Sequence, residues 1–207
     1  RAGLLHEKAT MMRKFSTAEV RKLRQRFKNG KPFPHAVIEN FLTNHKQLLS
    51  ALKKERFYKK DTDLFSFSQT SNLFYSKNTS VKAAVGMFSS EQFAGIISRI
   101  SGIKLKQGAV DVSGSLYEKT NCLLCHDDRL EGRKIAFIVY LSESFTAADG
   151  GALVFLGSRG NHPRNKAIAY PPLENSLMVF AVSKESWHEV EEVLSDKKRY
   201  TIGGWLH

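Results

Sequence analysis

Two histidines and one aspartate in this 207-residue chain have the types and the spacing to bind one metal ion. His126 and Asp128 are two residues apart, and in an extended strand such residues point to the same face. His188, much later in the chain, can supply a third ligand. Two imidazoles and one carboxylate make the facial triad of non-haem Fe(II) oxygenases, which leaves coordination positions open for a cosubstrate and dioxygen. These residues therefore predict an iron site.

An arginine and two tyrosines are candidates for binding an anionic cosubstrate. Arg199 follows the turn 195–198, so we expect a hairpin to return it alongside the strand of His188. A guanidinium can bind a carboxylate through two parallel hydrogen bonds, and a tyrosine hydroxyl can add another. Tyr140 and Tyr117 are the candidate tyrosines, although by spacing alone core packing is the better interpretation of both.

A competing motif overlaps the predicted iron site. The run Cys122-Leu-Leu-Cys125-His126 matches the pattern of c-type haem attachment, but that chemistry needs an export signal, and the chain shows none. A structural zinc site would need two ligands beyond Cys122 and Cys125, and there is no second cysteine pair. Packing is the favoured role for both cysteines. Asp127 is expected to point away from His126 into solvent.

The positive charge of the chain is concentrated at one end. Residues 1–60 hold 16 Lys or Arg and 4 Asp or Glu, whereas residues 61–207 hold 16 of each, so the whole net charge of +12 belongs to the first segment. Such a segment is either a solvated basic helix face with a leader, or an arm that contacts RNA or a ribonucleoprotein. The solvated face is the commoner case.

Cysteine usage and hydropathy bear on the compartment. Two cysteines fit a reducing environment, so we expect a cytoplasmic or nuclear protein. No apolar run is long enough to span a membrane, and residues 1–15 are too charged for a secretory signal. We interpret residues 1–15 as a leader that need not be ordered, and residues 16–207 as one domain.

The first part of that domain, residues 16–107, is predicted to be mostly helical support. Ser16 and Glu19 form a capping box that opens a helix to residue 28. A strand is expected over 35–41 and helices over 43–57 and 89–100. The polar stretch 58–80 is predicted to be a long surface loop, in the place where a lid would lie.

The second part, residues 108–207, is predicted to be the metal-binding core. Eight short extended runs separated by turn residues favour a sandwich or jelly roll with the helices packed outside one sheet. They span 108–118, 122–127, 134–142, 151–157, 166–170, 176–183, 186–193 and 199–206. Gly150-Gly151 and Gly203-Gly204 are expected at turns or bulges, and Trp187 and Trp205 in the core.

The run from Tyr117 to Leu141, with its His-Asp-Asp-Arg-Leu-Glu-Gly-Arg stretch and Ile-Ala-Phe-Ile-Val-Tyr-Leu strand, resembles the 2-oxoglutarate- and Fe(II)-dependent prolyl hydroxylases. It is most similar to the ribosomal branch, which modifies a proline of a small-subunit ribosomal protein near the decoding centre. Gly150-Gly-Ala-Leu, Trp187-His188-Glu-Val and the run 199–207 resemble the later strands of the same family.

The resemblance implies a double-stranded β-helix, a mainly β jelly roll with flanking helices. It implies iron ligation by His126, Asp128 and His188, binding of the distal carboxylate of 2-oxoglutarate by Arg199 and Tyr140, and a place for Tyr117 in the cosubstrate pocket. No catalytic side chain beyond the metal ligands is implied. Dioxygen is the second cosubstrate and ascorbate an expected stimulant.

The resemblance covers 108–207. Many members of this branch carry a second, non-catalytic jelly roll, so a chain that stops at residue 207 is either truncated or a catalytic domain alone. The favoured function is hydroxylation of a prolyl residue in a protein. Two alternatives stay open: a nucleic-acid demethylase of the same oxygenase class, and a non-catalytic jelly-roll module that docks on ribonucleoprotein through the basic residues 1–60.

Overall fold

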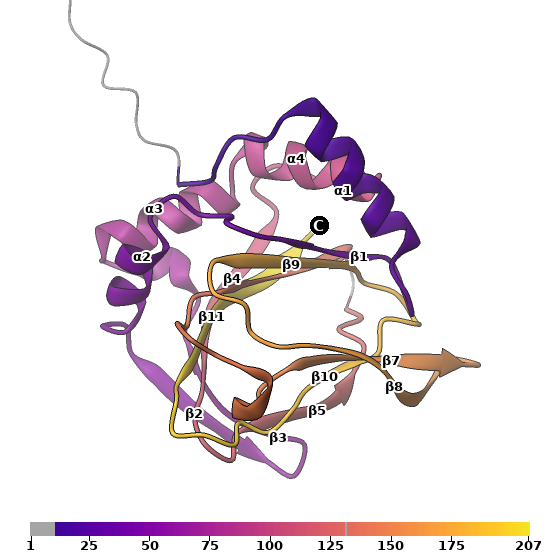
Figure 1. The fold of residues 1–207 in the computed structure, drawn as a ribbon. Helices are drawn as coiled ribbons and strands as arrows, with labels where there is room; N and C mark the ends of the chain where they lie inside the picture. The colour runs from indigo at the N-terminus through magenta and orange to yellow at the C-terminus, as the bar shows by residue number, and fades with distance from the viewer. Residues whose placement is uncertain (1–10, 131) are drawn as a thin grey trace, which may run out of the picture.

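The computed structural model describes residues 11–130 and 132–207. Figure 1 shows a curled, antiparallel β-sheet with its helices gathered on one side. The helical elements are α1 (Thr17–Asn29), α2 (His45–Leu52), η1 (Leu73–Tyr75), α3 (Thr79–Phe88), α4 (Glu91–Ser101) and η2 (Ala147–Asp149). The strands are β1 (His35–Ile38), β2 (Phe57–Thr62), β3 (Phe65–Thr70), β4 (Val110–Tyr117), β5 (Cys122–His126), β6 (Ile135–Tyr140), β7 (Leu153–Arg159), β8 (His162–Tyr170), β9 (Ser176–Ala181), β10 (His188–Val190) and β11 (Arg199–Leu206).

The strand order makes the sheet a jelly roll. The strands lie in the order β1-β9-β6-β11-β4-β3-β5-β10-β7-β8, with β2 paired to the outside of β3. Because β3 pairs with both β4 and β5, it joins the half of the sheet that contains β11 to the half that contains β10. The two halves fold toward each other and enclose a cavity. The predicted jelly roll with helices outside one sheet is confirmed.

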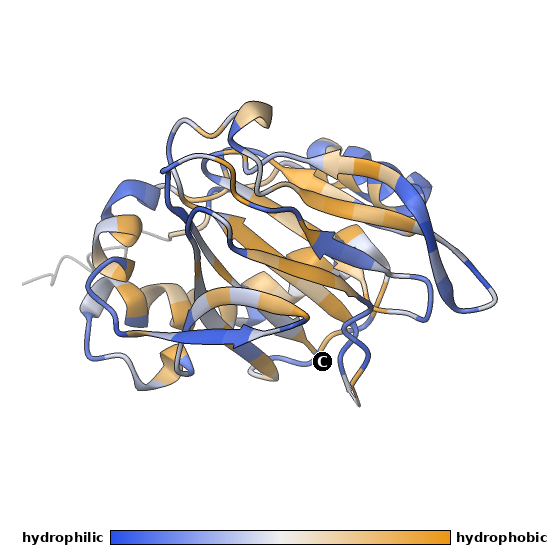
Figure 2. Cartoon of the chain, turned by 90° about the horizontal axis from the view of Figure 1, so that it is seen from below, coloured by the Kyte–Doolittle hydropathy of each residue, from blue (hydrophilic) through white to orange (hydrophobic). Residues whose placement is uncertain are grey.

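Two apolar clusters hold the roll together. Side chains on one face of the β1-β9-β6-β11-β4 half, such as Phe137, Val179 and Ile202, pack with the buried faces of the four α-helices. Side chains on the other face, such as Phe180, pack inside the roll with Phe155 of the opposite half. Figure 2 shows these hydrophobic residues along the strands. The alternation of side chains in a strand thus gives one half of the sheet two buried faces.

The predicted first helix is present as α1. The Ser16 side chain accepts a hydrogen bond from the Glu19 backbone N–H at 3.2 Å, as expected of a cap. The Glu19 carboxylate does not complete a box with Ser16; it accepts a hydrogen bond from Arg13 at 3.0 Å. Part of the expected leader packs against the domain, because Met12 is 2% exposed and forms a β-bridge with Leu42. Residues 1–10 of that leader lie outside the described residues.

The prediction of a long loop over 58–80 is wrong. This stretch contains β2, β3 and η1, and α3 begins at its end with Asn78 as the cap. The alternation of Phe65 and Phe67 with serines has the period of a strand, but the surrounding Ser, Thr, Asn and Asp suggested a loop by composition. These residues do not form a loop that could cover the site as a lid, because β3 is an internal strand of the sheet.

Gly203 and Gly204 lie inside β11, and not at the turn or bulge that was expected. A Cβ atom at residue 204 would overlap the backbone oxygen of Asp111 on β4. Gly204→Ala is therefore expected to lower the free energy of unfolding by about 3 kcal/mol, the upper end of overpacking costs. Urea unfolding would measure it.

The matched control is Gly86→Ala in α3, where an added Cβ meets no atom within 4 Å. It is expected to raise the free energy of unfolding by up to about 1 kcal/mol, because alanine favours helix more than glycine does. Equal stabilities of the Gly204 variant and the parent would contradict the close approach of β11 to β4.

Candidate metal and cosubstrate site

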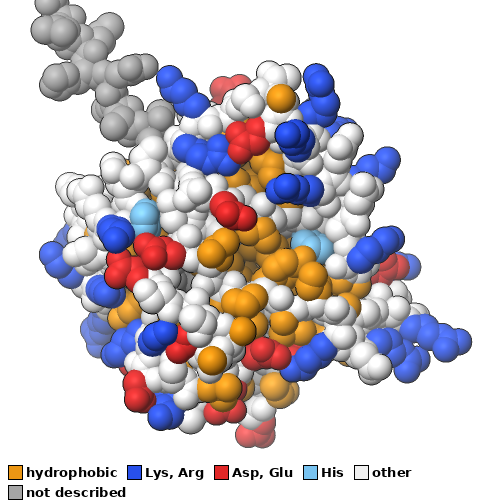
Figure 3. All heavy atoms as spheres, in the orientation of Figure 1, with side chains coloured by type: hydrophobic (Ala, Val, Ile, Leu, Met, Phe, Trp, Pro, Cys, Tyr) orange, Lys and Arg blue, Asp and Glu red, His pale blue; other side chains and the backbone are white. Residues whose placement is uncertain are grey.

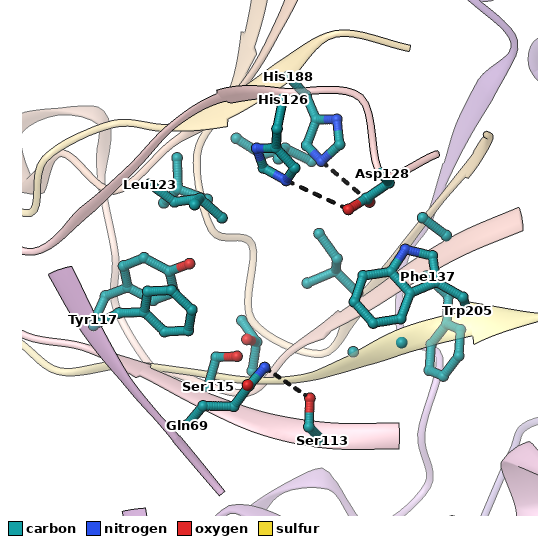
Figure 4. A pocket seen from close by; sticks show the side chains of 18 of the residues that line it. Gln69, Ser113, Ser115, Tyr117, Leu123, His126, Asp128, Phe137, His188 and Trp205 are labelled. Atoms are coloured by element: carbon teal, nitrogen blue, oxygen red, sulfur yellow. Dashed lines mark hydrogen bonds and ion pairs between the residues drawn. The ribbon is translucent and has the colours of Figure 1, made fainter. Parts of the chain in front are cut away.

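Two neighbouring strands and one turn bring the predicted triad together. His126 ends β5 and His188 begins β10, and the two residues are direct partners in the antiparallel ladder, with ring centroids 4.2 Å apart. The carboxylate of Asp128 reaches both rings, with Oδ1 3.5 Å from Nε2 of His126 and Oδ2 3.4 Å from Nε2 of His188. One ligand atom from each residue lies within 4.8 Å of the others. Figure 4 shows all three side chains converging.

His126 and Asp128 meet as predicted, but by a different geometry. The two were expected to share one face of an extended strand, but β5 ends at His126. Asp128 has a φ of +62°, in the left-handed region that aspartate tolerates better than most residues. A turn, and not strand periodicity, therefore aims its carboxylate at the histidines.

Backbone carbonyls orient both imidazole rings. Nδ1 of His126 lies 2.9 Å from the Leu124 oxygen, and Nδ1 of His188 lies 2.7 Å from the Ser186 oxygen. A carbonyl only accepts, so each Nδ1 carries a proton as donor, and each Nε2 is the ring nitrogen that faces Asp128 and is available to a metal ion. A metal-binding histidine is commonly held in this way, with one nitrogen fixed by a hydrogen bond and the other free for the ion.

The electrostatics of the triad favour a cation. Burial would raise the pKa of Asp128, but the hydrogen bonds and charges of His126 and His188 outweigh it and hold that pKa well below its usual range. Burial would lower the pKa of His126, but the Asp128 carboxylate outweighs it and raises that pKa. Asp128 is thus an ionised carboxylate in a nearly buried place. Asp127 points elsewhere and pairs with Arg129 at 2.6 Å, so it is not simply solvated as expected.

Arg199 faces the triad from the other half of the roll. The expected hairpin beside the His188 strand is wrong, because β11 lies between β6 and β4 while β10 lies between β5 and β7. Arg199 is 1% exposed, and its guanidinium carbon lies 4.9 Å from the ring centre of Tyr117 and 5.2 Å from that of Tyr140. Closing the roll, and not a local hairpin, brings Arg199 to the cavity.

Several buried polar atoms around Arg199 have no partner. Within the described residues, Nε and Nη2 of Arg199 and the hydroxyl of Tyr140 have no hydrogen-bond partner. Burial raises the pKa of Tyr117 and of Tyr140, and the Arg199 charge only partly opposes it, so both hydroxyls stay protonated. A buried cation with unused donors is costly unless an anion joins it. This group therefore fits a carboxylate, as expected from the sequence.

A cavity of about 170 Å³ connects the triad with Arg199. Tyr117 and Arg199 line it, and Tyr140 contacts Arg199 without being among the lining residues. The cavity also has polar side chains that were not predicted from the sequence, namely Gln69, Ser113, Ser115 and Thr201. Gln69 donates a hydrogen bond to Ser113 at 3.1 Å, as Figure 4 shows. Their signal in the sequence is alternation, since Ser113, Ser115 and Tyr117 are every second residue of β4.

The tryptophans and cysteines differ in part from expectation. Trp205 is partly buried against the inner apolar cluster, and it also lines the cavity, where the Arg133 guanidinium covers its ring at 3.4 Å. Trp187 is half-buried. Cys122 and Cys125 are free and partly buried, and within the described part of the chain neither belongs to a cluster of three metal ligands.

Comparison with known proteins agrees with this geometry. Residues 112–207 match the family model of the 2OG-Fe(II) oxygenase superfamily. The chain is also 41% identical over 182 residues to prolyl 3-hydroxylase OGFOD1 of Xenopus laevis, a match that covers 85% of this chain and 35% of the relative. Residues 112–207, which contain the triad and Arg199, form a domain of the 2OG-Fe(II) oxygenase superfamily. Membership implies Fe(II), 2-oxoglutarate and dioxygen as the cofactor and cosubstrates.

Further comparisons support the fold of this oxygenase. Prolyl 3,4-dihydroxylase OGFOD1 of Ostreococcus tauri is 33% identical over 199 residues, covering 86% of this chain and 38% of the relative. A prolyl hydroxylase of Trichoplax adhaerens, solved with a peptide of the hypoxia inducible factor oxygen degradation domain, superposes with a TM-score of 0.69 at 16% identity, covering 93% of each chain. The chain spans about a third of the length of the curated relatives it matches.

The helices of this oxygenase are short and amphipathic. Among the described residues no helix has both the length and the apolar content needed to cross a membrane.

Proposed function

We propose that this oxygenase hydroxylates a prolyl residue of a protein, using Fe(II), 2-oxoglutarate and dioxygen. The observation that carries the proposal is the cavity itself, which has an ionised His-Asp-His triad in one half of the roll and an unpaired buried arginine in the other. Curated relatives at 33–41% identity are named prolyl 3-hydroxylase or prolyl 3,4-dihydroxylase, which supports proline as the target and C3 as a hydroxylated position.

In this proposal His126, Asp128 and His188 hold Fe(II) through two Nε2 atoms and one carboxylate oxygen. A triad of two histidines and one carboxylate would leave coordination positions of the ion free for the cosubstrates. The single negative charge of Asp128 balances the ion only in part, which leaves it able to take an anionic cosubstrate. When bound, Fe(II) would allow dioxygen to oxidise 2-oxoglutarate and the substrate together. One oxygen atom would enter succinate as carbon dioxide leaves, and the other would convert the substrate C–H bond to C–OH.

The remaining side chains bind and orient. Arg199 donates to the distal carboxylate of 2-oxoglutarate from Nε and Nη2, and Tyr140 donates from its hydroxyl, which uses the atoms that are otherwise without a partner. Tyr117 stacks on Phe67 at 4.9 Å and keeps water from the guanidinium. Apolar walls such as Leu153 and Phe180 exclude part of the water around the triad, which strengthens the hydrogen bonds on its buried side.

The substrate is proposed to be a small-subunit ribosomal protein, following the resemblance of the His126–Leu141 stretch to the ribosomal branch. Ascorbate is proposed as a stimulant that keeps the iron reduced. The two free cysteines fit a cytoplasmic or nuclear protein.

The test is mass spectrometry of a proline-containing peptide from the decoding-centre ribosomal protein, after incubation with this chain, Fe(II), ascorbate and 2-oxoglutarate. We expect one added oxygen on proline that is absent when 2-oxoglutarate is left out. Succinate release without a mass change would refute the substrate and keep the oxygenase chemistry. Absence of both products, with Fe(II) and 2-oxoglutarate bound, would refute hydroxylation by this domain.

A further inference from the structure

A basic hairpin projects from the body beside the proposed iron site. β7 and β8 extend past the rest of the sheet, and Figures 1 and 2 show them as a two-stranded ribbon. The side chains of residues 162–169 are exposed. Arg159 and Arg164 make no ion pair with any described acidic residue, whereas Lys166 pairs with Glu189 and Glu191. Arg159 and Arg164 are therefore the two hairpin cations whose charge is left without an acidic partner among the described residues.

The strand register places this hairpin at the end of the roll that carries the triad. His188 pairs with His126 on one side and with Phe155 on the other. β5 and β7 are each antiparallel to β10, so they run in the same direction. Arg159 therefore lies about 13 Å beyond Phe155, toward the end where Asp128 follows β5.

A second basic surface lies on α1. Val20, Leu23 and Phe27 face the core, and the exposed face carries cations. These are Arg21, Lys22, Arg24, Arg26 and Lys28, none of them paired with a described acidic residue. Arg24 donates instead to the Arg99 backbone oxygen. Lys22 and Arg26 also line a groove between α1 and β1. Figures 1 and 3 show α1 and the β7–β8 hairpin at the same edge of the molecule, with blue side chains over both.

We propose that this edge binds the phosphate backbone of RNA. The basic edge comprises Arg21, Lys22, Arg26 and Lys28 on α1 and Arg159 and Arg164 on the hairpin. This binding does not depend on the proposed hydroxylation. The proposed RNA surface includes the basic N-terminal segment and also a hairpin from the electrically balanced half of the chain. The hairpin lies next to the iron site, so RNA on the edge would pass beside the cavity.

The chemistry of the edge favours RNA over a membrane. A helix that lies on a membrane inserts apolar side chains, and those of α1 are buried in the core. Arginine is the commonest cation of the basic edge, and its planar fork matches phosphate. Cations spread over two separate elements also suit a repeating anion better than a single charged group.

The test measures binding of a fluorescent, mixed-sequence, single-stranded RNA by anisotropy at several salt concentrations. Three double variants each change the net charge by the same amount. They are Arg159→Glu with Arg164→Glu on the hairpin, Arg21→Glu with Lys28→Glu on α1, and, as the control, Lys77→Glu with Lys82→Glu. The control residues are exposed and lie at and before α3, on the opposite side in Figure 1. Thermal melting checks that each variant folds.

We expect the hairpin and helix variants each to weaken RNA binding about tenfold, and the slope of log Kd against log salt to fall by about 0.7 for each phosphate that is no longer neutralised. The control is expected to stay within about twofold, because net charge alone acts weakly at a distance in salt. Absence of binding by the parent chain, an equal loss in the control, or a loss in only one of the two edge variants would each overturn the proposal. Displacement of the RNA by polyglutamate as efficiently as by unlabelled RNA would also overturn it, in favour of an acidic protein partner.

The same variants separate this inference from the proposed function. None of the substituted residues lines the cavity, so turnover of 2-oxoglutarate without RNA should equal that of the parent. If the parent chain hydroxylates the peptide but does not bind RNA, the RNA-binding proposal alone is refuted. If the parent chain binds RNA through this edge but leaves the peptide unmodified, only the proposed hydroxylation is refuted.

Discussion

Asp128→Asn is expected to lower 2-oxoglutarate turnover at least about 100-fold, since loss of groups that only support a metal ligand already costs 10–100-fold. The substitution keeps the shape of the side chain and removes its charge. The Asp128 carboxylate lies 3.5 Å from Nε2 of His126 and 3.4 Å from Nε2 of His188. Succinate release would report turnover, and calorimetry with Mn(II) would report metal affinity. His188→Ala should cause a similar loss of both.

The neighbouring residue provides the matched control. Asp127→Asn makes the same chemical change one position earlier, but the Asp127 carboxylate faces Arg129, whose side chain is about half exposed. A surface ion pair of this kind contributes less than about 1 kcal/mol, so turnover should stay within about twofold of the parent. Equal losses in the two variants, or metal binding retained in the Asp128 variant, would contradict the assigned ligands.

Much of the site could be predicted because its residue types are chemically restrictive. Few combinations of side chains bind iron and leave positions open, and His126, Asp128 and His188 are one of them. The route by which they meet could not be predicted. Asp128 depends on a left-handed turn, and Arg199 depends on closure of the roll, which brings together strands that are far apart in sequence.

The errors in the predicted fold have a related cause. β10 is three residues long where 186–193 was expected, because irregular pairing with β5 ends the ladder early. β3 was missed because serines alternate with Phe65 and Phe67, and composition outweighed period. Alternation places Ser113 and Ser115 on the same face of β4 as Tyr117, but it does not show that this face lines an internal cavity. Local patterns predict which segments are extended better than they predict what each strand faces.

Arg199→Met is expected to raise the KM for 2-oxoglutarate about 100-fold or more. Removing one partner of a buried, hydrogen-bonded charge pair costs about 2–5 kcal/mol of binding, and each 1.4 kcal/mol is about tenfold in affinity. The kcat at saturating cosubstrate should change much less, because Arg199 would contact the carboxylate that does not react. Tyr140→Phe, which removes only one hydroxyl, should raise the KM about tenfold, in line with the loss of one hydrogen bond to a charged group.

The melting temperature of the Arg199→Met variant distinguishes a role in binding from a role in packing. Without cosubstrate, Nε and Nη2 of Arg199 are buried and unpaired, so the guanidinium costs free energy and its replacement by methionine should leave the melting temperature unchanged or higher. The parent should gain stability when 2-oxoglutarate is added with Mn(II), and the Arg199→Met variant should gain little. A variant that melts well below the parent without ligand would identify Arg199 as part of the packing.

The decisive comparison uses 2-oxovalerate, which has the keto-acid end of 2-oxoglutarate and lacks the distal carboxylate. If Arg199 binds that carboxylate, the parent should bind 2-oxovalerate weakly, and Arg199→Met should bind it no worse. The loss caused by the substitution and the loss caused by the missing carboxylate would then not add, as is expected of two groups that interact only with each other. Additive losses would mean that Arg199 acts elsewhere, and that the unpaired donors of Arg199 and Tyr140 await another anion.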